Sequence, residues 1–274
     1  MSIQERIPMF NIIGERINTS RKSVFEAVEK RDKNYIQDDV KKQQAAGATY
    51  IDVNAGARIG HEREDMLWLI EVIQESVDLP LCLDSPDPGT LKDALPLTEK
   101  DPLVNSITLE KDRYVPMAEF LAGKTCGVVA LCMDDSGMPT SADQVIDRAA
   151  KLIEGLKNIG FDEKRIFVDP LIQPIATDTL NGSMALASVQ GISKSYPQVH
   201  FTCGLSNISY GMPQRRVLNR TFLTLMMAHG LDGAIMDPLD AKLMTAIRTA
   251  DALLGKDESC LGYLKAFREK RIIE

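Results

Sequence analysis

Short runs of apolar residues recur along the chain, and between them lie longer stretches in which apolar positions repeat every three or four residues. Brief apolar runs that end in a polar residue or a glycine are typical of parallel strands buried on both faces. Eight such runs predict strands at 9–14, 50–54, 81–84, 103–106, 127–133, 165–169, 199–203 and 233–237.

The intervening stretches predict helices. Amphipathic helices with one apolar face are predicted at 64–77, 141–158 and 240–254, and a helix that is apolar on several faces is predicted at 217–230. Ser141 and Asp240 are predicted N-caps, since a short polar side chain can accept a bond from the first free N–H groups. Glycines that suit left-handed helix ends are Gly47, Gly160 and Gly230.

Eight alternating strand and helix units without a long linker predict a (β/α)8 TIM barrel, formed by one domain over residues 1–274. A doubly wound open sheet is the alternative. It normally uses fewer strands, and a nucleotide-binding member should carry a glycine fingerprint after its first strand. The segment Gly14-Glu15-Arg16-Ile17-Asn18 contains one glycine, which disfavours a dinucleotide site.

Composition narrows the function classes. The net charge of −7, with no basic run, disfavours binding to nucleic acid or to an anionic membrane surface. The five cysteines form no CxxC pair, which indicates free thiols in a reducing compartment. The segment Met1–Arg6 is polar, and no window has the roughly 18 apolar residues of a membrane span, so we expect a cytoplasmic protein.

In such a barrel the chemistry lies at the carboxyl ends of the strands. The polar residues there are mostly carboxylates and carboxamides: Glu15, Arg16, Asn18, Asp52, Asn54, Asp84, Ser85, Asn105, Ser106, Asp169, Ser206, Asn207 and Asp237. None of the histidines (His61, His200 and His229) has a carboxylate or cysteine at metal spacing, and we expect no bound metal. His200 is expected at the bottom of the barrel in a stabilising role, and a serine hydrolase is disfavoured because the GxSxG elbow is missing.

These side chains suit a flat heteroaromatic ring. A carboxylate accepts two parallel N–H bonds from an aminopyrimidinone edge, and an asparagine supplies one donor and one acceptor. Any one of them has an alternative role as a turn former or N-cap. Taken jointly, Asp84, Asn105, Asp169 and Asn207 predict a pterin site.

Seven motifs occur in order at these strand ends and just beyond: Gly14-Glu15-Arg16-Ile17-Asn18, Asp52-Val53-Asn54-Ala55-Gly56, Leu81-Cys82-Leu83-Asp84-Ser85, Val104-Asn105-Ser106, Asp169-Pro170-Leu171-Ile172, Gly204-Leu205-Ser206-Asn207-Ile208-Ser209 and Leu218-Asn219-Arg220-Thr221-Phe222. The set resembles the pterin-binding methyltransferase family, in particular the stand-alone methyltetrahydrofolate:corrinoid/iron–sulfur-protein methyltransferases of acetogens. The resemblance spans about residues 9–255.

The resemblance implies a homodimer that takes methyltetrahydrofolate as methyl donor and passes the N5-methyl group to, or receives it from, the Co(I) of a separate corrinoid protein. By that likeness Asp84, Asn105 and Asp169 hold the pterin, and Asn207 matches the residue that hydrogen-bonds the folate N5. The predicted substrate-binding set is completed by Ser206, Asp52, Asn54 and Glu15.

The chain departs from the acetogen pattern after Asn207, where Tyr210-Gly211-Met212-Pro213 and Gln214-Arg215-Arg216 replace a more polar loop. This departure leaves the acceptor protein open. The folate tail is anionic, and candidates to steer it are Arg16, Arg215, Arg216 and Arg220.

Two alternatives share the scaffold. Dihydropteroate synthase binds pterin similarly but uses a lysine after a late strand, and no lysine lies between Lys194 and Lys242. A non-catalytic pterin-binding subunit of a methyltransferase complex stays open. We expect Asn207 to strengthen its bond to N5 in the transition state, and the direction of transfer to depend on the partner.

Overall fold

The computed structural model describes residues 10–274. The predicted start of the first strand at Met9 and the polar stretch Met1–Arg6 therefore lie outside the described residues. Eight parallel strands form one sheet in the order β7-β6-β5-β4-β3-β2-β1-β8, so the predicted (β/α)8 barrel is confirmed. The strands are β1 (Asn11–Asn18), β2 (Tyr50–Asn54), β3 (Leu81–Asp84), β4 (Leu103–Ile107), β5 (Gly127–Leu131), β6 (Ile166–Asp169), β7 (His200–Phe201) and β8 (Gly233–Met236).

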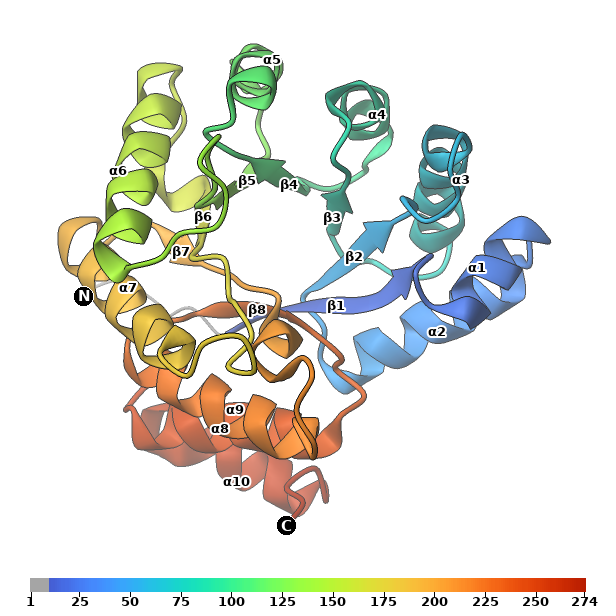
Figure 1. Ribbon diagram of the computed structural model, residues 1–274. Helices are drawn as coiled ribbons and strands as arrows, with labels where there is room; N and C mark the ends of the chain where they lie inside the picture. Colours follow the sequence, from blue (N-terminus) through green and yellow to red (C-terminus); the bar gives the residue numbers. More distant parts are fainter. Residues whose placement is uncertain (1–9) are drawn as a thin grey trace, which may run out of the picture.

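Helices surround the ring of strands (Figure 1). They are α1 (Lys22–Glu29), α2 (Lys33–Ala46), α3 (Glu62–Gln74), α4 (Pro88–Ala94), α5 (Lys111–Leu121), α6 (Ala142–Asn158), α7 (Asn181–Ser195), α8 (Arg215–Ala228), α9 (Ala241–Leu253) and α10 (Leu261–Arg268), with 3-10 turns η1 (Leu95–Leu97), η2 (Glu163–Arg165), η3 (Leu205–Ser209) and η4 (Glu258–Cys260). Within residues 10–274, no helix has the length and apolar character needed to cross a membrane.

The predicted helix ends are confirmed where the sequence marks them. The side chain of Ser141 accepts a hydrogen bond from the N–H of Gln144 at the start of α6, and Asp240 accepts two at the start of α9. Glycines with left-handed backbone at or just after helix ends are Gly47, Gly160 and Gly230, with φ values of 110°, 91° and 117°.

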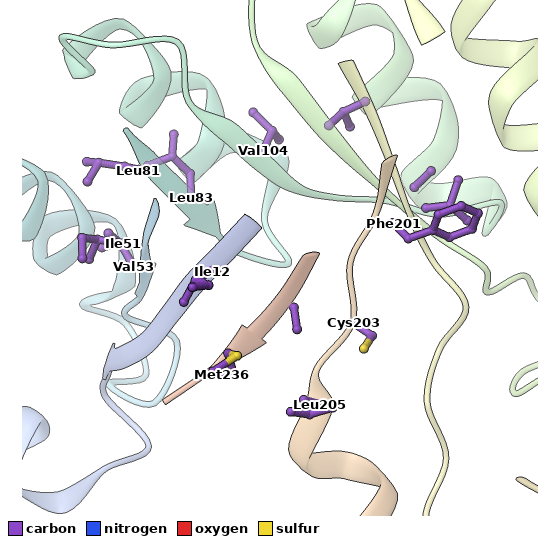
Figure 2. Packing of buried hydrophobic residues seen from close by; sticks show 14 of the residues in the cluster. Ile12, Ile51, Val53, Leu81, Leu83, Val104, Phe201, Cys203, Leu205 and Met236 are labelled. Carbon is purple, nitrogen blue, oxygen red and sulfur yellow. The ribbon is translucent and has the colours of Figure 1, made fainter. Parts of the chain in front are cut away.

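Alternate residues of each strand belong to two different cores, because successive side chains point to opposite faces of a strand. Ile51, Leu81 and Val104 pack in the large core between the sheet and the helices, as Figure 2 shows for these three among others. Cys82 and Leu103 pack in a smaller cluster with Ile13, Val129 and Phe167. This second cluster fills the barrel interior, as the side-chain layers of such barrels do, and it forms the floor of the mouth.

β1 differs from the prediction. The predicted strand end at Gly14 is wrong, since β1 continues to Asn18 and its register with β2 shifts between Gly14 and Ile17. Arg16, inside this irregular segment, is held by the carboxylate of Asp39 on α2 and by Asp237, with N···O distances of 2.8 and 2.9 Å. The other strands agree with the prediction to within two residues at each end.

The barrel closes between β7 and β8 through few backbone bonds. The N–H of Ile235 donates to the carbonyl of Cys203 at 2.9 Å. The side chain of Asp232 accepts a bond from the N–H of Phe201 at 2.7 Å and meets Nδ1 of His200 at 2.6 Å. The sequence spacing indicated no carboxylate partner for any histidine. In the fold, Asp232 is the partner of His200, because β8 begins beside β7. His200 has the expected stabilising position at the bottom of the barrel.

We predict that Gly233→Ala destabilises the closed barrel. A Cβ at Gly233, the first residue of β8, would lie 2.8 Å from the carbonyl oxygen of Phe201 on β7 and 3.3 Å from that of Asn11 on β1. The backbones of β7 and β1 cannot move away from this Cβ without disrupting the closure of the barrel. The free energy of unfolding should therefore fall by about 1–3 kcal/mol. Urea denaturation measures this change.

Gly182→Ala is the matched control. A Cβ at Gly182, in the first turn of α7, would meet only a side-chain carbon of Ile175 at 3.8 Å, and its effect should be neutral or slightly stabilising. Equal stability of the two variants would contradict the role given to Gly233.

Candidate functional site

Carboxylates and carboxamides from neighbouring strands meet at the mouth of the barrel. Asn54, Asp84 and Asn105 are register partners across β2, β3 and β4. The amide of Asn54 donates to a carboxylate oxygen of Asp84 at 2.8 Å. The structure therefore brings together these three residues of the predicted set, side by side and above the apolar floor of the barrel.

Asp52 lies one layer below, opposite Cys82 in the register of β2 and β3. Its side chain is buried, and Oδ1 has no hydrogen-bond partner among the described residues. Burial, followed by the charge of Asp84, raises the pKa of Asp52 well above its ordinary value. Burial also raises the pKa of Asp84, against the opposing effect of the Asn54 bond. The surroundings of Asp52 and Asp84 thus favour the protonated form of both carboxyls.

Asp169 ends β6 and is buried. Its Oδ1 accepts a hydrogen bond from the N–H of Leu171 at 2.8 Å. Leu171 has a left-handed backbone with φ of 61°, which costs an L residue roughly 1 kcal/mol. Burial raises the pKa of Asp169 to about 7, and the Leu171 bond only partly opposes it. Asp169 is therefore a carboxyl that titrates near neutral pH, with Oδ2 making no hydrogen bond to residues 10–274.

The turn η3 carries Ser206 and Asn207 and is fastened from two sides. The carbonyl of Ser206 accepts a bond from the Arg215 guanidinium at 2.7 Å, and the carbonyl of Ile208 accepts one from the N–H of Ile175 at 3.0 Å. A Cβ at Gly204 would lie 3.0 Å from the Asn207 amide nitrogen, so the glycine leaves room for that amide. Asn207 is exposed at the mouth on a turn whose backbone is fixed.

A cavity of about 730 Å³ opens beside η3, between the ends of β1 and β8 and the starts of α8 and α9. Its walls include Glu15 and Ser206 of the predicted set, but not Asp84, Asn105 or Asp169, which lie on strands farther around the ring. Burial, and then the charge of Asp237, raises the pKa of Glu15 to about 7. The predicted set thus divides between the barrel mouth and this cavity.

Two residues in the cavity wall were missed by the sequence analysis. Lys242 lies in the first turn of α9, and Asn219 lies in the second turn of α8. Their positions in the sequence could have indicated them. Both residues lie near the start of a helix that follows a strand, and such helices begin at the barrel mouth.

Arg16 needs a correction. It lines the cavity, but its guanidinium is already held by Asp39 and Asp237, so it is not a free cation for an anionic tail. No group of three or more His, Cys, Asp or Glu residues within 10–274 is arranged to hold a metal ion.

Comparisons with known proteins agree on the type of site. A profile of the family described as "Pterin binding enzyme" matches residues 14–237. The methylcorrinoid:tetrahydrofolate methyltransferase of Eubacterium limosum is 40% identical over 95% of this chain and 97% of its own length. The methionine synthase of Mycobacterium leprae is 31% identical over 84% of this chain, and the match covers 20% of that longer enzyme.

Solved structures share the fold. The dihydropteroate synthase of Xanthomonas albilineans in complex with 7,8-dihydropteroate superposes with a TM-score of 0.70, covers 90% of this chain and 94% of its own, and is 18% identical. The structure of Mycobacterium tuberculosis Rv1207 superposes with a TM-score of 0.67 and is 19% identical over 90% of this chain and 93% of its own. At this identity the likeness extends to the fold alone.

We predict that Asp169→Asn stabilises the ligand-free protein in a pH-dependent way. The folded state keeps the Asp169 proton up to about pH 7, whereas an unfolded chain releases it near the ordinary value of 3.8. Stability is therefore lost as the pH rises from about 4 through 7, by roughly 4 kcal/mol in total. Asparagine keeps the acceptor for Leu171 and carries no charge, so its advantage should grow over that window and level off above it.

Denaturant titrations at pH 5 and pH 8 measure the effect. Asp38→Asn, an exposed residue of α2, is the control and should show no comparable gain. An advantage of Asp169→Asn that is the same at both pH values would contradict the burial of an ionisable carboxyl at this position.

Proposed function

The chain belongs to the family of pterin-binding enzymes and is a methyltransferase, and from that premise we propose that it moves a methyl group between N5 of tetrahydrofolate and the cobalt of a corrinoid carried by a separate protein. The observation that carries the proposal is the paired Asp84 and Asn105 on neighbouring strands together with the buried Asp169 at the end of β6. The 40% identity to the Eubacterium limosum enzyme over nearly the whole of both chains supports it.

We assign the pterin ring to the barrel mouth. The carboxylates of Asp84 and Asp169 accept N–H bonds from the aminopyrimidinone edge, and Asn105 supplies one donor and one acceptor. Both carboxyls have raised pKa values in the ligand-free chain. Ring N–H groups favour the ionised form of a carboxyl, so pterin binding should draw a proton off the site. Asn54 orients Asp84 through its hydrogen bond to the carboxylate, and Asp52 lies one layer below.

The direction in the name of the Eubacterium limosum relative runs from methylcorrinoid to tetrahydrofolate, and we propose this direction here. The N5 lone pair forms the new C–N bond to the methyl carbon while the Co–C bond breaks and its electron pair stays on the cobalt as Co(I). The N5 proton is released to water. Methyl transfer in the opposite direction, from methyltetrahydrofolate to Co(I), starts with protonation of N5. Without that proton the departing nitrogen would be a strongly basic amide anion, which is a poor leaving group.

Asn207 is assigned to N5. Its amide is exposed at the mouth on the fixed turn η3, where it can hydrogen-bond the nitrogen whose charge changes during transfer. An amide cannot accept or release a proton at neutral pH, so its contribution is a hydrogen bond that strengthens in the transition state. The open mouth is suited to an approach by a large cofactor on another protein.

The assembly forms part of the proposal. We propose one domain over residues 1–274, a homodimer and a location in the cytoplasm, with the corrinoid protein as a transient partner. The homodimer is supported by large apolar side chains that are exposed on the last two helices, with exposed fractions of 81% for Leu253 on α9 and of 65% for Leu261 and 64% for Phe267 on α10. Contiguous apolar surface on such helices is commonly covered by a second chain.

The direct test is anaerobic spectroscopy of the purified chain with free methylcob(III)alamin and tetrahydrofolate. We expect enzyme-dependent appearance of the Co(I) absorbance, and an equal yield of methyltetrahydrofolate. Asp169→Asn should abolish most of this activity while raising the free energy of unfolding. The reason is that the Asp169 carboxylate is needed to bind the pterin but destabilises the folded protein when it is buried without a ligand. Folate binding without transfer would favour the non-catalytic subunit, and condensation of para-aminobenzoate would favour the synthase.

We predict that Asn207→Ala lowers kcat for methyl transfer by about 10²-fold, the usual cost of losing one donor to a developing charge. The dissociation constant for the folate should change by less than about threefold, because the bond forms mainly in the transition state. Stopped-flow turnover and equilibrium titration separate the two effects.

Asn158→Ala is the control for this experiment, because Asn158 is exposed at the end of α6 and should leave both quantities unchanged. Weaker folate binding by Asn207→Ala with unaltered turnover would contradict the role assigned to the amide.

A further inference from the structure

The cavity beside η3 concentrates positive charge in a chain whose net charge is −7. Its walls carry the side chains of Arg215, Arg216, Arg220 and Lys242. Within residues 10–274, Arg220 and Lys242 form no salt bridge. The Arg216 side chain is 87% exposed, and its Nε lies 3.9 Å from a carboxylate oxygen of Asp240. These cations are therefore available to an anionic ligand.

The acidic residues of the same cavity are largely engaged elsewhere. Asp237 is bound to the Arg16 guanidinium at 2.9 Å and accepts the N–H of Leu239 at 3.0 Å. Asp240 caps α9 by accepting the N–H groups of Lys242 and Leu243. Glu15, whose pKa is raised to about 7, is only partly ionised at neutral pH. The field in the cavity is thus positive despite three carboxyls in its walls.

Polar groups without partners also face this region. Oδ1 of Asn219, a lining residue, is buried and has no hydrogen-bond partner among the described residues. The N-cap of α8, Gln214, makes no side-chain bond to the first turn, so no capping side chain compensates the positive end of this helix. A ligand that fits has carboxylates for the cations and an N–H donor for Asn219.

The cavity adjoins the reacting end of the assigned folate. Its wall includes Ser206, the residue before Asn207. In folate the ring carbon that bears the tail is bonded directly to N5, so a ring with N5 at Asn207 sends its tail out on the side of η3. A tail of several γ-linked glutamates carries a free α-carboxylate on each residue, a free γ-carboxylate on the last residue, and a peptide N–H at each link.

We infer that this cavity is a binding site for a γ-linked polyglutamate tail, so that the chain selects polyglutamylated folates over the monoglutamate. The inference rests on the proposed function and deepens it by naming the form of the substrate. Arg220 and Lys242 are its main cations. Arg215 contributes less, because its guanidinium also holds the carbonyl of Ser206 and the hydroxyl of Ser209.

The test compares equilibrium binding of methyltetrahydrofolate with one and with three glutamates, at low and at high salt. The wild-type chain should bind the triglutamate about tenfold more tightly at low salt, with the preference shrinking as salt screens the ion pairs. The double variant Arg220→Gln/Lys242→Gln should lose the preference and bind the monoglutamate within about threefold of wild type. Lys194→Gln, at the exposed end of α7 away from the mouth, should keep the full preference.

The outcomes separate the two proposals. Equal binding of the two folates by the wild-type chain overturns the tail site and leaves the proposed function standing, as does a preference that survives in the double variant. Failure of the wild-type chain to bind either folate overturns the proposed function and the tail site together. As a second probe, the para-aminobenzoyl triglutamate fragment without the ring should compete with the triglutamate folate in wild type and lose that competition in the double variant.

Discussion

The mouth of the barrel is organised by carboxyls that are buried without a compensating cation. Asp169 has one backbone N–H as its partner and no positive charge that lowers its pKa. Asp52 is buried with one oxygen unpaired, beside the carboxyl of Asp84. Taking such groups out of water is costly unless they stay protonated or find donors. A flat ring with several N–H groups, the ligand proposed for this site, would supply those donors.

The barrel supports this site by linking its loops to one another. The N–H of Ser85 donates to the carbonyl of Asn105, and the N–H of Ile175 donates to that of Ile208. Arg148 of α6, itself buried, donates to the carbonyls of Cys132 and Gly137 and so holds the loop after β5. Polar side chains on separate strands therefore keep fixed positions relative to each other, which a ring-binding site requires.

Charge divides the substrate-binding region into two parts of opposite character. The end of the barrel at β3, β4 and β6 gathers acidic and amide groups, whereas the cavity near β8 and α8 gathers arginine and lysine. A reduced folate has the same polarity, with N–H donors at one end and carboxylates at the other. The turn η3 stands between the two parts, and in the proposed function Asn207 on this turn lies beside the nitrogen next to the tail-bearing ring carbon.

The sequence by itself determined the barrel and most of the rim. Strand-length apolar runs and helical periodicity are local properties, so they predicted β2–β8 to within two residues at each end and placed Asp84, Asn105 and Asp169 at strand ends. Tertiary structure decided what depends on distant neighbours. Arg16 looked free in sequence, but the fold brings Asp39 of α2 and Asp237, the residue after β8, to its guanidinium. β1 continues past Gly14 because Ile17 and Asn18 pair with β2. Lys242 and Asn219 were not assigned to a common site from the sequence, although Asn219 lies in one of the seven motifs, because a cavity wall is made by elements that only the closed ring brings together.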